Sequence, residues 1–368
     1  MSAITVQDLV DALNPASLSE TPNRFTIRVG ELTLDCLFEN DSLCAELRRY
    51  FGHVISDCES ADMTVHVFGE AVLPFHVDYK DWAREPGKTG RKDAIADLED
   101  GRMVFKVRTG VTFLQSATWR LAFGPTSAHP NQVINFINTQ ILNHYQRVGW
   151  VGCHAAAVAC ETRTLAIAGL SGGGKSTTML RLMDLDGASY VTNDRLLVGA
   201  DAPLPKALGI PKLPRINPGT IVTNPRLKGM LSSERTDTLL SMPQEELWQL
   251  EEKYDLFVDE VYGPNRIAHQ TALTDFWVLN WSRETDEPTQ FIEVNIAERP
   301  DLLSAIMKNP GPFYCKPDGI FWTDDEHVDA AGYIAALKGV KIQEVSGKID
   351  FEAVYAAGAR LLKAPEPV

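Results

Sequence analysis

The sequence predicts an α/β fold in two parts: an antiparallel α+β module at the N-terminal end, followed by a domain built on a mixed sheet. Three observations lead to this fold class. Residues 1–128 alternate short apolar runs with turn residues. A glycine-rich run, GLSGGGKS at 169–176, stands between an apolar strand candidate and a helix candidate. A hairpin candidate leads directly into that run, whereas most runs of this kind are reached from a parallel strand after a helical crossover.

Length and composition indicate a globular protein of two domains. The chain has 368 residues, of which 44% are hydrophobic and 23% charged, so it can bury a sizeable core. We expect an N-terminal α+β module of unknown role over 1–128 and a connecting helix over 129–149. A second domain with C-terminal helical elaborations should then cover 150–368.

Charge and hydropathy limit the partners and the location. The chain has 35 Lys and Arg residues against 49 Asp and Glu residues, a formal net charge of −14. We therefore expect no nucleic acid and no membrane as a partner. No apolar run approaches the roughly 20 residues of a membrane span, and no basic residue precedes Arg24, so we expect a cytoplasmic protein. The six cysteines form no CxxC pair, which predicts buried, reduced thiols rather than a zinc or redox site.

The N-terminal module divides into strands separated by turn signals. Residues 24–38 alternate around Gly30 and predict a hairpin, and Asp100 with Gly101 predicts a second hairpin between two apolar runs. The strands expected after the first hairpin cover 63–68, 95–98, 103–107, 111–114 and 119–123. No residue pattern in this module points to a reaction.

Helical periodicity predicts the connecting helix, which begins at Pro130 and reaches Gly149. In the second domain, residues 154–160 and 164–168 predict the two strands of a hairpin, and a helix opens at Thr177. Further along the chain we expect an acidic helix, a core strand and three more helices, at 243–254, 274–281, 299–308, 327–338 and 350–363.

The run at 169–176 fits the phosphate-binding loop pattern GxxxxGK[ST]. Glycines let successive backbone amides approach phosphate oxygens, and the start of a helix favours the same anion. Lys175 can reach the β and γ phosphates of ATP, and the Ser176 hydroxyl can ligate Mg²⁺. The residues expected to bind the nucleotide are Gly169, Ser171, Gly172, Gly173, Gly174, Lys175, Ser176 and Thr177. The alternative is a glycine-rich turn that binds nothing.

A basic, proline-rich stretch follows at 200–230, in a chain that is acidic as a whole. It carries Lys206, Lys212 and Arg215, and no acidic residue occurs between Pro203 and Ser233. Such a cluster indicates a loop that faces an anion, with an ordinary solvated loop as the alternative.

The segment 154–194, HAAAVACETRTLAIAGLSGGGKSTTMLRLMDLDGASYVTND, resembles the C-terminal catalytic domain of HPr kinase/phosphorylase. That family has a strand that begins with His-Ala, a hairpin, a GxSGxGKS loop, a helix and a strand that ends in Asp-Asp. The arrangement is most similar to the HPr-kinase-related proteins, and the match covers 150–230 but not the N-terminal module. The resemblance implies a P-loop kinase core of the HPr kinase/PEP-carboxykinase type with a mixed sheet.

The resemblance also implies roles for individual residues. His154 matches a family histidine near the phosphate site, and Asp194 matches the second aspartate, which serves the metal and the acceptor hydroxyl. Asn193 stands where the first aspartate belongs, and an amide cannot accept a proton as a carboxylate does. Either Asp194 does both jobs, or the base lies elsewhere, or the reaction needs none, because phosphoryl transfer depends mainly on positioning and charge neutralisation. The stretch 204–210 keeps the Gly-Ile of the family's phosphorolysis loop but lacks its acid, which argues against the reverse reaction.

The activity implied by the resemblance is an ATP- and Mg-dependent kinase that transfers the γ-phosphate to a hydroxyl of a protein serine or a small molecule. The expected catalytic residues are Asp194, Lys175, His154, Lys206 and Arg215, and the expected metal ligands are Ser176 and Asp194. Two alternatives stay open: an ATPase or nucleotide-dependent switch, and a catalytically degenerate nucleotide-binding regulator. Relatives form oligomers, so a homo-oligomer is also open.

Overall fold

The computed structural model describes residues 4–58, 60–84, 89–169, 173–250 and 252–363. The chain divides into two compact units: Met1–Gly149 with Asn309–Val328, and Trp150–Lys308 with Asp329–Val368. Within the described residues, every helix falls short of the length and apolar character that a membrane crossing requires.

The core of the first unit is a nine-stranded mixed sheet in the order β3-β1-β2-β4-β9-β8-β7-β6-β5. The hairpin predicted around Gly30 is confirmed, because β1 and β2 pair antiparallel and Gly30 turns the chain with a φ of 60°, which glycine adopts without strain. The strands cover Arg24–Val29 (β1), Leu32–Phe38 (β2), Ile55–Ser56 (β3), Met63–Val67 (β4), Lys80–Asp81 (β5), Asp93–Asp97 (β6), Gly101–Lys106 (β7), Thr112–Ser116 (β8) and Arg120–Phe123 (β9).

The purely antiparallel arrangement predicted for this module is wrong, because β4 pairs parallel with both β2 and β9. The helix α2, Asp41–Tyr50, follows β2 and packs against it. It returns the chain so that β4 can run in the same direction as β2. Parallel neighbours need such a crossover, whereas antiparallel neighbours need only a turn.

Two more helices belong to the first unit. In α1, Val6–Leu13, the side chains of Thr5 and Asp8 exchange hydrogen bonds with each other's backbone amides and fix the start of the helix. The predicted connecting helix is α3, Pro130–Arg147, and its Phe136 stacks on Phe113 of β8 with the ring centroids 4.6 Å apart. The compact unit that contains α3 extends to Gly149, so this helix is part of the first unit rather than a separate connector.

Residues 309–328 also belong to the first unit, whereas the sequence analysis places them in the second domain. Arg102 of β7 gives the physical reason. Its side chain is 2% exposed and pairs with Asp97, and its Nη1 donates to the carbonyl oxygens of Pro312 at 3.1 Å and Trp322 at 2.6 Å. A buried guanidinium requires such partners, because an unsatisfied buried donor costs free energy. Arg102 therefore holds this late segment against the N-terminal sheet.

The second unit contains a six-stranded sheet in the order β13-β11-β12-β19-β21-β20 and a four-stranded sheet in the order β10-β14-β15-β18. In the six-stranded sheet β11 and β12 form the predicted hairpin, while β12, β19 and β21 run parallel, so this sheet is mixed as expected. The strands cover Val151–Cys153 (β10), Ala156–Ala159 (β11), Thr164–Gly169 (β12), Ser189–Thr192 (β13), Leu196–Gly199 (β14), Lys206–Gly209 (β15), Gln270–Ala272 (β18), Asp275–Leu279 (β19), Gln290–Glu293 (β20) and Lys341–Ser346 (β21), and a separate ribbon pairs Arg215–Ile216 (β16) with Tyr254–Asp255 (β17).

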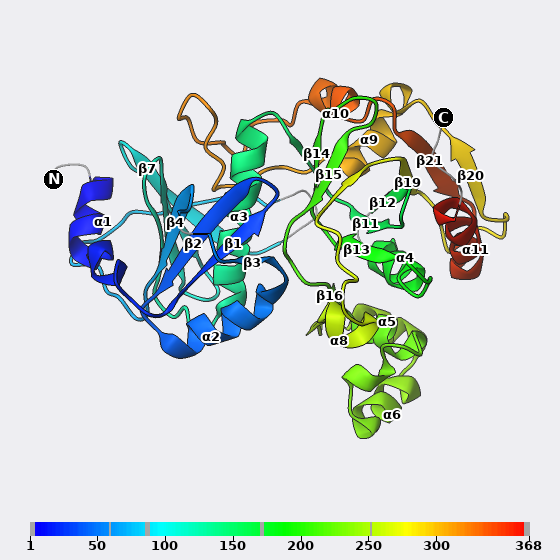
Figure 1. Ribbon diagram of the computed structural model, residues 1–368, viewed down its shortest axis with the longest axis horizontal. Coiled ribbons are helices and arrows are strands. Elements are labelled where there is room, and N and C mark those ends of the chain that lie inside the picture. The colour runs from blue at the N-terminus through cyan, green and yellow to red at the C-terminus, as the bar shows by residue number, and fades with distance from the viewer. Residues whose placement is uncertain (1–3, 59, 85–88, 170–172, 251, 364–368) are drawn as a thin grey trace. The chain divides into compact units, whose positions relative to one another are not determined.

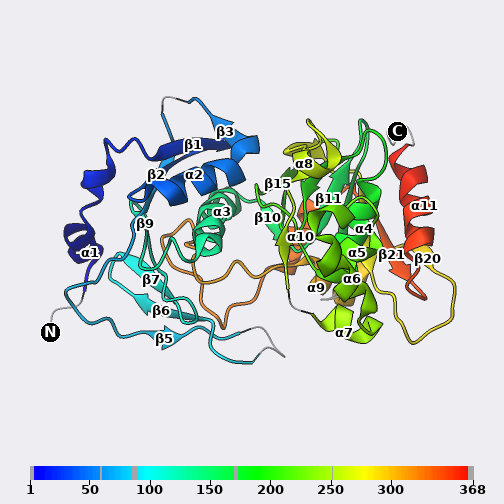
Figure 2. The ribbon, with the colours of Figure 1, turned by 90° about the horizontal axis from the view of Figure 1, so that it is seen from below.

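Helices cover both faces of the six-stranded sheet. Leu165 and Ile167 of β12 face a buried core that they share with Met179 and Leu182 of α4. The helix α11 lies beside α4, and Figures 1 and 2 show the two together, whereas α9 contacts β12 and β19 from the other side of the sheet (Figure 1). The helices are α4 (Lys175–Leu182), α8 (Val258–Tyr262), α9 (Pro300–Ile306), α10 (Ala330–Ala336) and α11 (Phe351–Leu362).

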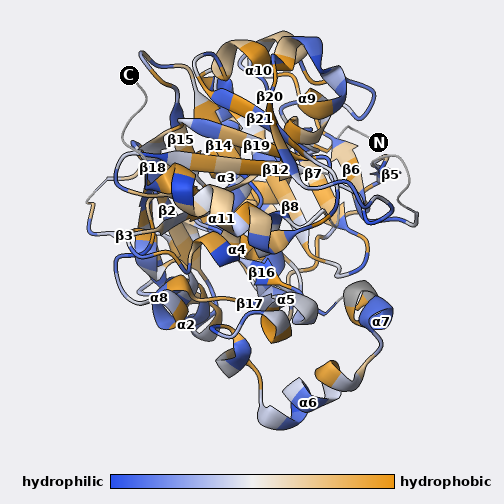
Figure 3. Cartoon of the chain, turned by 90° about the vertical axis from the view of Figure 1, so that its right-hand side faces the viewer, coloured by the Kyte–Doolittle hydropathy of each residue, from blue (hydrophilic) through white to orange (hydrophobic). Residues whose placement is uncertain are grey.

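The basic stretch and the acidic helix predicted after it form a small helical projection. It consists of α5 (Pro218–Thr223), α6 (Ser233–Ser241) and α7 (Gln244–Gln249), and Val222, Leu239 and Leu247 give it a small core of its own. Figure 3 shows α6 and α7 extending away from the sheet, whose strands β12 and β19 are coloured hydrophobic. The stretch 200–230 is therefore not one loop, since it contains β15, β16 and α5.

We expect Arg102→Ala to loosen residues 309–328 and to lower the free energy of unfolding by about 2–4 kcal/mol, because two carbonyl groups and Asp97 lose their partner. Limited proteolysis read by mass spectrometry measures cleavage within this segment, and urea unfolding measures the free energy. The matched control is Arg91→Ala, since Arg91 and Asp81 form an ion pair with side chains 62% and 50% exposed, and such pairs contribute about 0–1 kcal/mol. Equal effects of the two substitutions would contradict the anchoring role of Arg102.

Candidate functional site

The candidate site lies at one edge of the six-stranded sheet, where several strands end together. Gly169 at the end of β12 is in register with Leu279 at the end of β19, and Leu279 is in register with Val345 of β21. β13 is antiparallel to β11, which is antiparallel to β12, so β13 also ends at this edge, at Thr192. The chain leaves β12 into α4 on one face, while α9 covers the opposite face. Ligands of α/β proteins bind in the crevice at such a switch point.

The glycine-rich run occupies the end of β12 and the start of α4. Of the eight residues expected to bind the nucleotide, Ser171 and Gly172 lie outside the described residues. Gly174 has a φ of 89°, and a Cβ atom on it would lie 2.9 Å from the Phe351 ring, so this position requires glycine for both conformation and space. The Lys175 ammonium group donates to the carbonyl oxygen of Gly169 at 2.8 Å and thus lies across the loop.

The first turn of α4 offers amide groups to a ligand. Gly174 supplies no side chain to cap these amides, and no capping hydrogen bond to them is found among the described residues. The first four N–H groups of a helix have no partner within it and carry a partial positive charge. Ser176 and Thr177 in this turn are half-buried, and the Thr177 hydroxyl lies 3.1 Å from that of Thr220. This helix start therefore fits an anionic group such as a phosphate.

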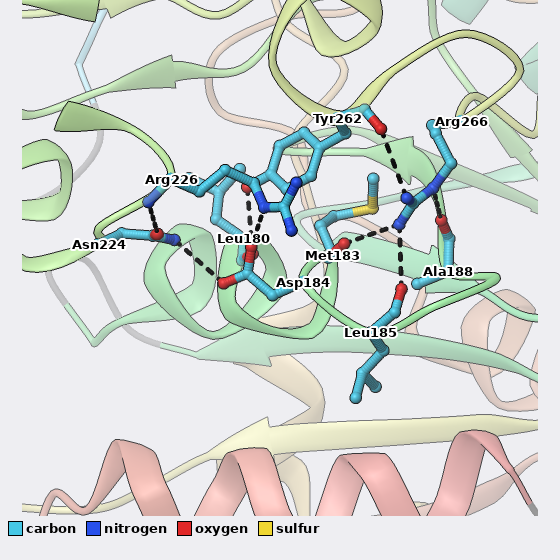
Figure 4. A network of polar contacts seen from close by, with 9 residues as sticks. All are labelled: Leu180, Met183, Asp184, Leu185, Ala188, Asn224, Arg226, Tyr262 and Arg266. Carbon is cyan, nitrogen blue, oxygen red and sulfur yellow. Dashed lines mark hydrogen bonds and ion pairs between the residues drawn. The ribbon is translucent and has the colours of Figure 1, made fainter. Parts of the chain in front are cut away.

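The opposite end of α4 is anchored by two side chains, Tyr262 and Arg266 (Figure 4). Tyr262 is the last residue of α8, and Arg266 follows this helix in the sequence. The Arg266 Nη2 donates to the carbonyl oxygens of Met183 at 2.7 Å and Leu185 at 3.0 Å. The Tyr262 hydroxyl donates to the carbonyl oxygen of Leu180 at 3.2 Å. A cation at a helix C-terminus also interacts favourably with the helix dipole. These contacts fix the axis of α4, and hence the position of its first turn.

Asp194 lies at the same edge, in the bend between β13 and β14, and it gathers two neighbours. The His154 Nε2 is 3.1 Å from its Oδ1, and the Arg195 Nε is 3.4 Å from its Oδ2. The three side chains are 40%, 30% and 29% exposed for Asp194, His154 and Arg195 respectively, so solvent or a ligand can reach them. The His154 amide donates to the carbonyl oxygen of Ile306 at 2.7 Å, which fixes the backbone that carries the imidazole.

The electrostatic surroundings keep Asp194 ionised. Burial alone would raise the pKa of Asp194, but the hydrogen bond to His154 and the charges of Arg195 and Lys212 outweigh it and hold this pKa well below the ordinary value. Burial lowers the pKa of Lys175, an effect that the carboxylate of Asp194 opposes. The pKa of Lys212 is lowered in the same way by burial, again against the attraction of Asp194.

The structure does not bring every predicted catalytic residue to Asp194. Lys206 lies at the far end of β15, in register with Gly199, and its ammonium group pairs with Asp201 at 3.0 Å. Lys206 lies three residues along β15 from Gly209, which pairs with Leu196 next to the Asp194 bend, and a strand rises about 3.3 Å per residue, so about 10 Å of strand lies between them. Arg215 of β16 pairs with Asp255 of β17 at 3.0 Å, and thus belongs to the β16–β17 ribbon.

Two observations bear on a metal ion at this site. Among the described residues, no three His, Cys, Asp or Glu side chains gather as a metal site. Mg²⁺, however, needs only one or two protein oxygens when phosphate oxygens and water supply the remaining ligands. The Oδ1 of Asn193, beside Asp194, is buried and has no hydrogen-bond partner among the described residues. The hydroxyl of Ser176, the carboxylate of Asp194 and the amide oxygen of Asn193 are all oxygen donors of the kind that Mg²⁺ prefers.

Sequence reasoning missed two aromatic residues at this edge, Trp281 and Phe351. The Trp281 Nε1 donates to the carbonyl oxygen of Gly173 at 2.8 Å, and the Phe351 ring packs on Gly174. Trp281 falls at the end of the predicted core strand, and Phe351 falls at the start of a predicted helix. Neither position carries a local signal, because only the pairing of β12 with β19 and of β19 with β21 brings the two rings to the glycine-rich run.

Comparisons with known proteins add one distant likeness. No protein-family model matches the chain, and no curated protein matches it. A solved structure of the HPr(Ser) kinase/phosphatase from Coxiella burnetii aligns with 57% of this chain and 93% of its own, at 10% sequence identity and a TM-score of 0.29. At this TM-score the likeness carries no argument about fold or function.

We expect the Asp194 carboxyl group to stay ionised as the pH falls below its ordinary pKa of 3.8. Because the folded pKa lies below the unfolded one, the stability contributed by this carboxylate is complete above pH 3.8 and is lost as the pH falls through the lower folded pKa. Carboxyl ¹³C NMR of labelled aspartate measures this titration.

His154→Ala should move the Asp194 pKa up toward the ordinary value, because the variant removes a hydrogen bond to the charged form. His76→Ala is the control, since the His76 side chain is 88% exposed and lies in the first unit. A pKa of Asp194 that does not respond to His154→Ala would contradict the role given to His154.

Proposed function

We propose that this protein is an ATP- and Mg-dependent kinase that transfers the γ-phosphate to a hydroxyl group. The arrangement that supports the proposal is the juxtaposition, at one sheet edge, of an uncapped helix start with Lys175 and of an ionised Asp194 with Arg195 and Lys212 around it. A phosphoryl-transfer site needs donors for the phosphates, cations for the developing charge and a carboxylate for a metal. The residues present match each of these requirements.

In this proposal the first-turn amides of α4 and the Lys175 ammonium group bind the β and γ phosphates. Lys175 donates to Gly169 in the structure, so it exchanges that carbonyl oxygen for phosphate oxygens when the nucleotide binds. Mg²⁺ held by Ser176 and Asp194 would neutralise charge on the phosphates and orient them. Arg195 and Lys212 add positive charge on the side of Asp194, where the transferred group and an anionic acceptor would lie.

The low pKa of Asp194 limits what this carboxylate can do. An efficient general base has a pKa near the working pH, and that of Asp194 lies far below it. We therefore assign Asp194 to charge and metal binding rather than to proton abstraction. Loss of the acceptor proton can follow a largely dissociative transfer of the phosphoryl group, which requires little activation of the nucleophile. On this account an amide is tolerated at Asn193.

The reaction is tested by incubating the purified protein with γ-labelled ATP, Mg²⁺ and a lysate of its host. A kinase moves label to a protein or a metabolite, which identifies the acceptor class. Release of labelled phosphate alone would indicate the ATPase or switch. Binding of nucleotide without either outcome would indicate the regulator.

We expect Lys175→Ala to reduce phosphoryl transfer by about 10²–10³-fold, because a preorganised charge that faces the γ-phosphate is lost. The fold should be retained, since Lys175 is half-buried at the loop and makes no ion pair among the described residues. Circular dichroism checks the fold and the labelled assay measures the rate. Lys341→Ala is the matched control, because Lys341 begins β21 at the opposite edge of the same sheet and pairs with Glu293. Normal turnover in Lys175→Ala would place the site elsewhere.

Asn193→Asp tests whether the missing acid limits the reaction. Burial beside the ionised Asp194 would raise the pKa of a carboxyl group at this position and make it a usable base, but a largely dissociative transfer needs little activation of the nucleophile. We therefore expect the rate of transfer to change by less than about tenfold, although a positioned base contributes about 10²–10⁴-fold in other enzymes. A larger increase would show that proton abstraction limits the native protein.

A further inference from the structure

We propose that Trp281 and Phe351 form the binding site for the base of the nucleotide, which stacks on this aromatic pair. The inference rests on the proposed function and adds to it the position and the orientation of the nucleotide. It is carried by two aromatic side chains, Trp281 just after β19 and Phe351 at the start of α11, which meet beside the glycine-rich run. Aromatic side chains bind nucleobases by stacking, because every base offers a π face.

The two rings contact the start of α4 directly. The Trp281 indole donates to the Gly173 carbonyl oxygen at 2.8 Å, and a Cβ atom on Gly174 would lie 2.9 Å from the Phe351 ring and 3.2 Å from the Trp281 ring. The ring centroids of Trp281 and Phe351 are 5.3 Å apart with an interplanar angle of 80°. The two rings therefore meet edge to face, and because both residues are half-buried, part of their ring surface stays accessible to a third ring.

The burial of the pair differs from that of a core aromatic residue. Trp277, four residues earlier in β19, is 1% exposed and lies within the hydrophobic core. Trp281 and Phe351 are both half-buried. They lie past the last register pair of the parallel strands, Leu279 with Val345, where the sheet has ended. They are thus placed to contact both the loop and a ligand in the crevice.

The loops that carry the rings are joined to each other. The Ser282 amide, next to Trp281, donates to the Gly347 carbonyl oxygen at 2.9 Å. Asp350 caps α11 by accepting from the amides of Glu352 and Ala353, which fixes the helix start on which Phe351 lies. A platform that is rigid before the ligand arrives loses little conformational entropy on binding.

The order of the strands gives the nucleotide a direction. Along the sheet, β13 with Asp194 lies on one side of β12, and β19 with Trp281 lies on the other. The cationic groups Arg195 and Lys212 surround Asp194, so the γ-phosphate end belongs on that side. The base end then points the opposite way, toward Trp281 and Phe351. One extended nucleotide can reach both ends with its phosphates on the first turn of α4.

The test compares ATP with inorganic tripolyphosphate, which has the phosphates but no base. Isothermal titration calorimetry with Mg²⁺ gives both dissociation constants for the wild type, Phe351→Leu and the matched control Phe291→Leu. Phe291 contacts Trp277 in the core and not the loop, with ring centroids 4.9 Å apart. We expect Phe351→Leu to weaken ATP binding by about tenfold, or about 1.4 kcal/mol, and to leave tripolyphosphate binding unchanged. Phe291→Leu should change neither, and Phe351→Tyr should bind ATP as the wild type does.

A second readout uses the indole itself. Binding of ATP should quench the fluorescence of Trp281, so part of the quenching measured in the wild type should be absent in Trp281→Phe. Tripolyphosphate should quench the wild type much less than ATP does. Equal weakening of both ligands by Phe351→Leu would overturn the base site and leave the pair as a brace of the loop, with the kinase proposal intact. A wild-type protein that binds neither ligand would instead overturn the proposed function, and the base site with it.

Discussion

The parallel, in-register pairing of β12 with β19 and of β19 with β21 is the constraint on which the candidate site depends. Parallel strands end at the same edge, so the glycine-rich run, Trp281 and the start of α11 come together. They do so although Phe351 follows Gly169 by 182 positions in the sequence. The helices then leave the sheet on opposite faces, α4 on one and α9 on the other. The meeting of these segments at one edge is therefore a result of topology, and any loss of the β12–β19 register would move the glycine-rich run away from Trp281 and Phe351.

The helix α4 is held in place by contacts at both of its ends. At the start, Trp281 bonds to Gly173 and Phe351 packs on Gly174. At the other end, Arg266 and Tyr262 satisfy carbonyl groups that the helix leaves without a partner, and Arg226 with Asn224 binds Asp184 just beyond it (Figure 4). Such supports matter for phosphoryl transfer, in which positioning and fixed charge supply most of the catalysis. The helix is short, so its stability comes from these contacts rather than from its own length.

The charged groups around Asp194 are mostly cationic, although the chain as a whole is acidic. The protein carries a formal net charge of −14, yet Asp194 is surrounded by Arg195, Lys212 and His154, and Lys175 lies nearby. This excess of cations keeps the carboxylate ionised and suits a phosphate-bearing ligand. It also bears on the role of this acid, because a carboxylate with a low pKa accepts a proton poorly at neutral pH. The amide at Asn193 is consistent with a reaction that does not depend on a strong base.

The sequence alone determined the local parts of this protein: the hairpin around Gly30, the hairpin of β11 and β12, the helix from Pro130, and the strand, loop and helix order around Lys175. These features depend on turn chemistry and on periodicity among residues close in the chain. Only the tertiary structure decided that β4 runs parallel to β2, that residues 309–328 return to Arg102, and that Lys206 lies far from Asp194 while Trp281 lies on the loop. Hydrogen bonds between distant strands and the partners of a buried charge set these arrangements, and neither leaves a pattern in neighbouring residues.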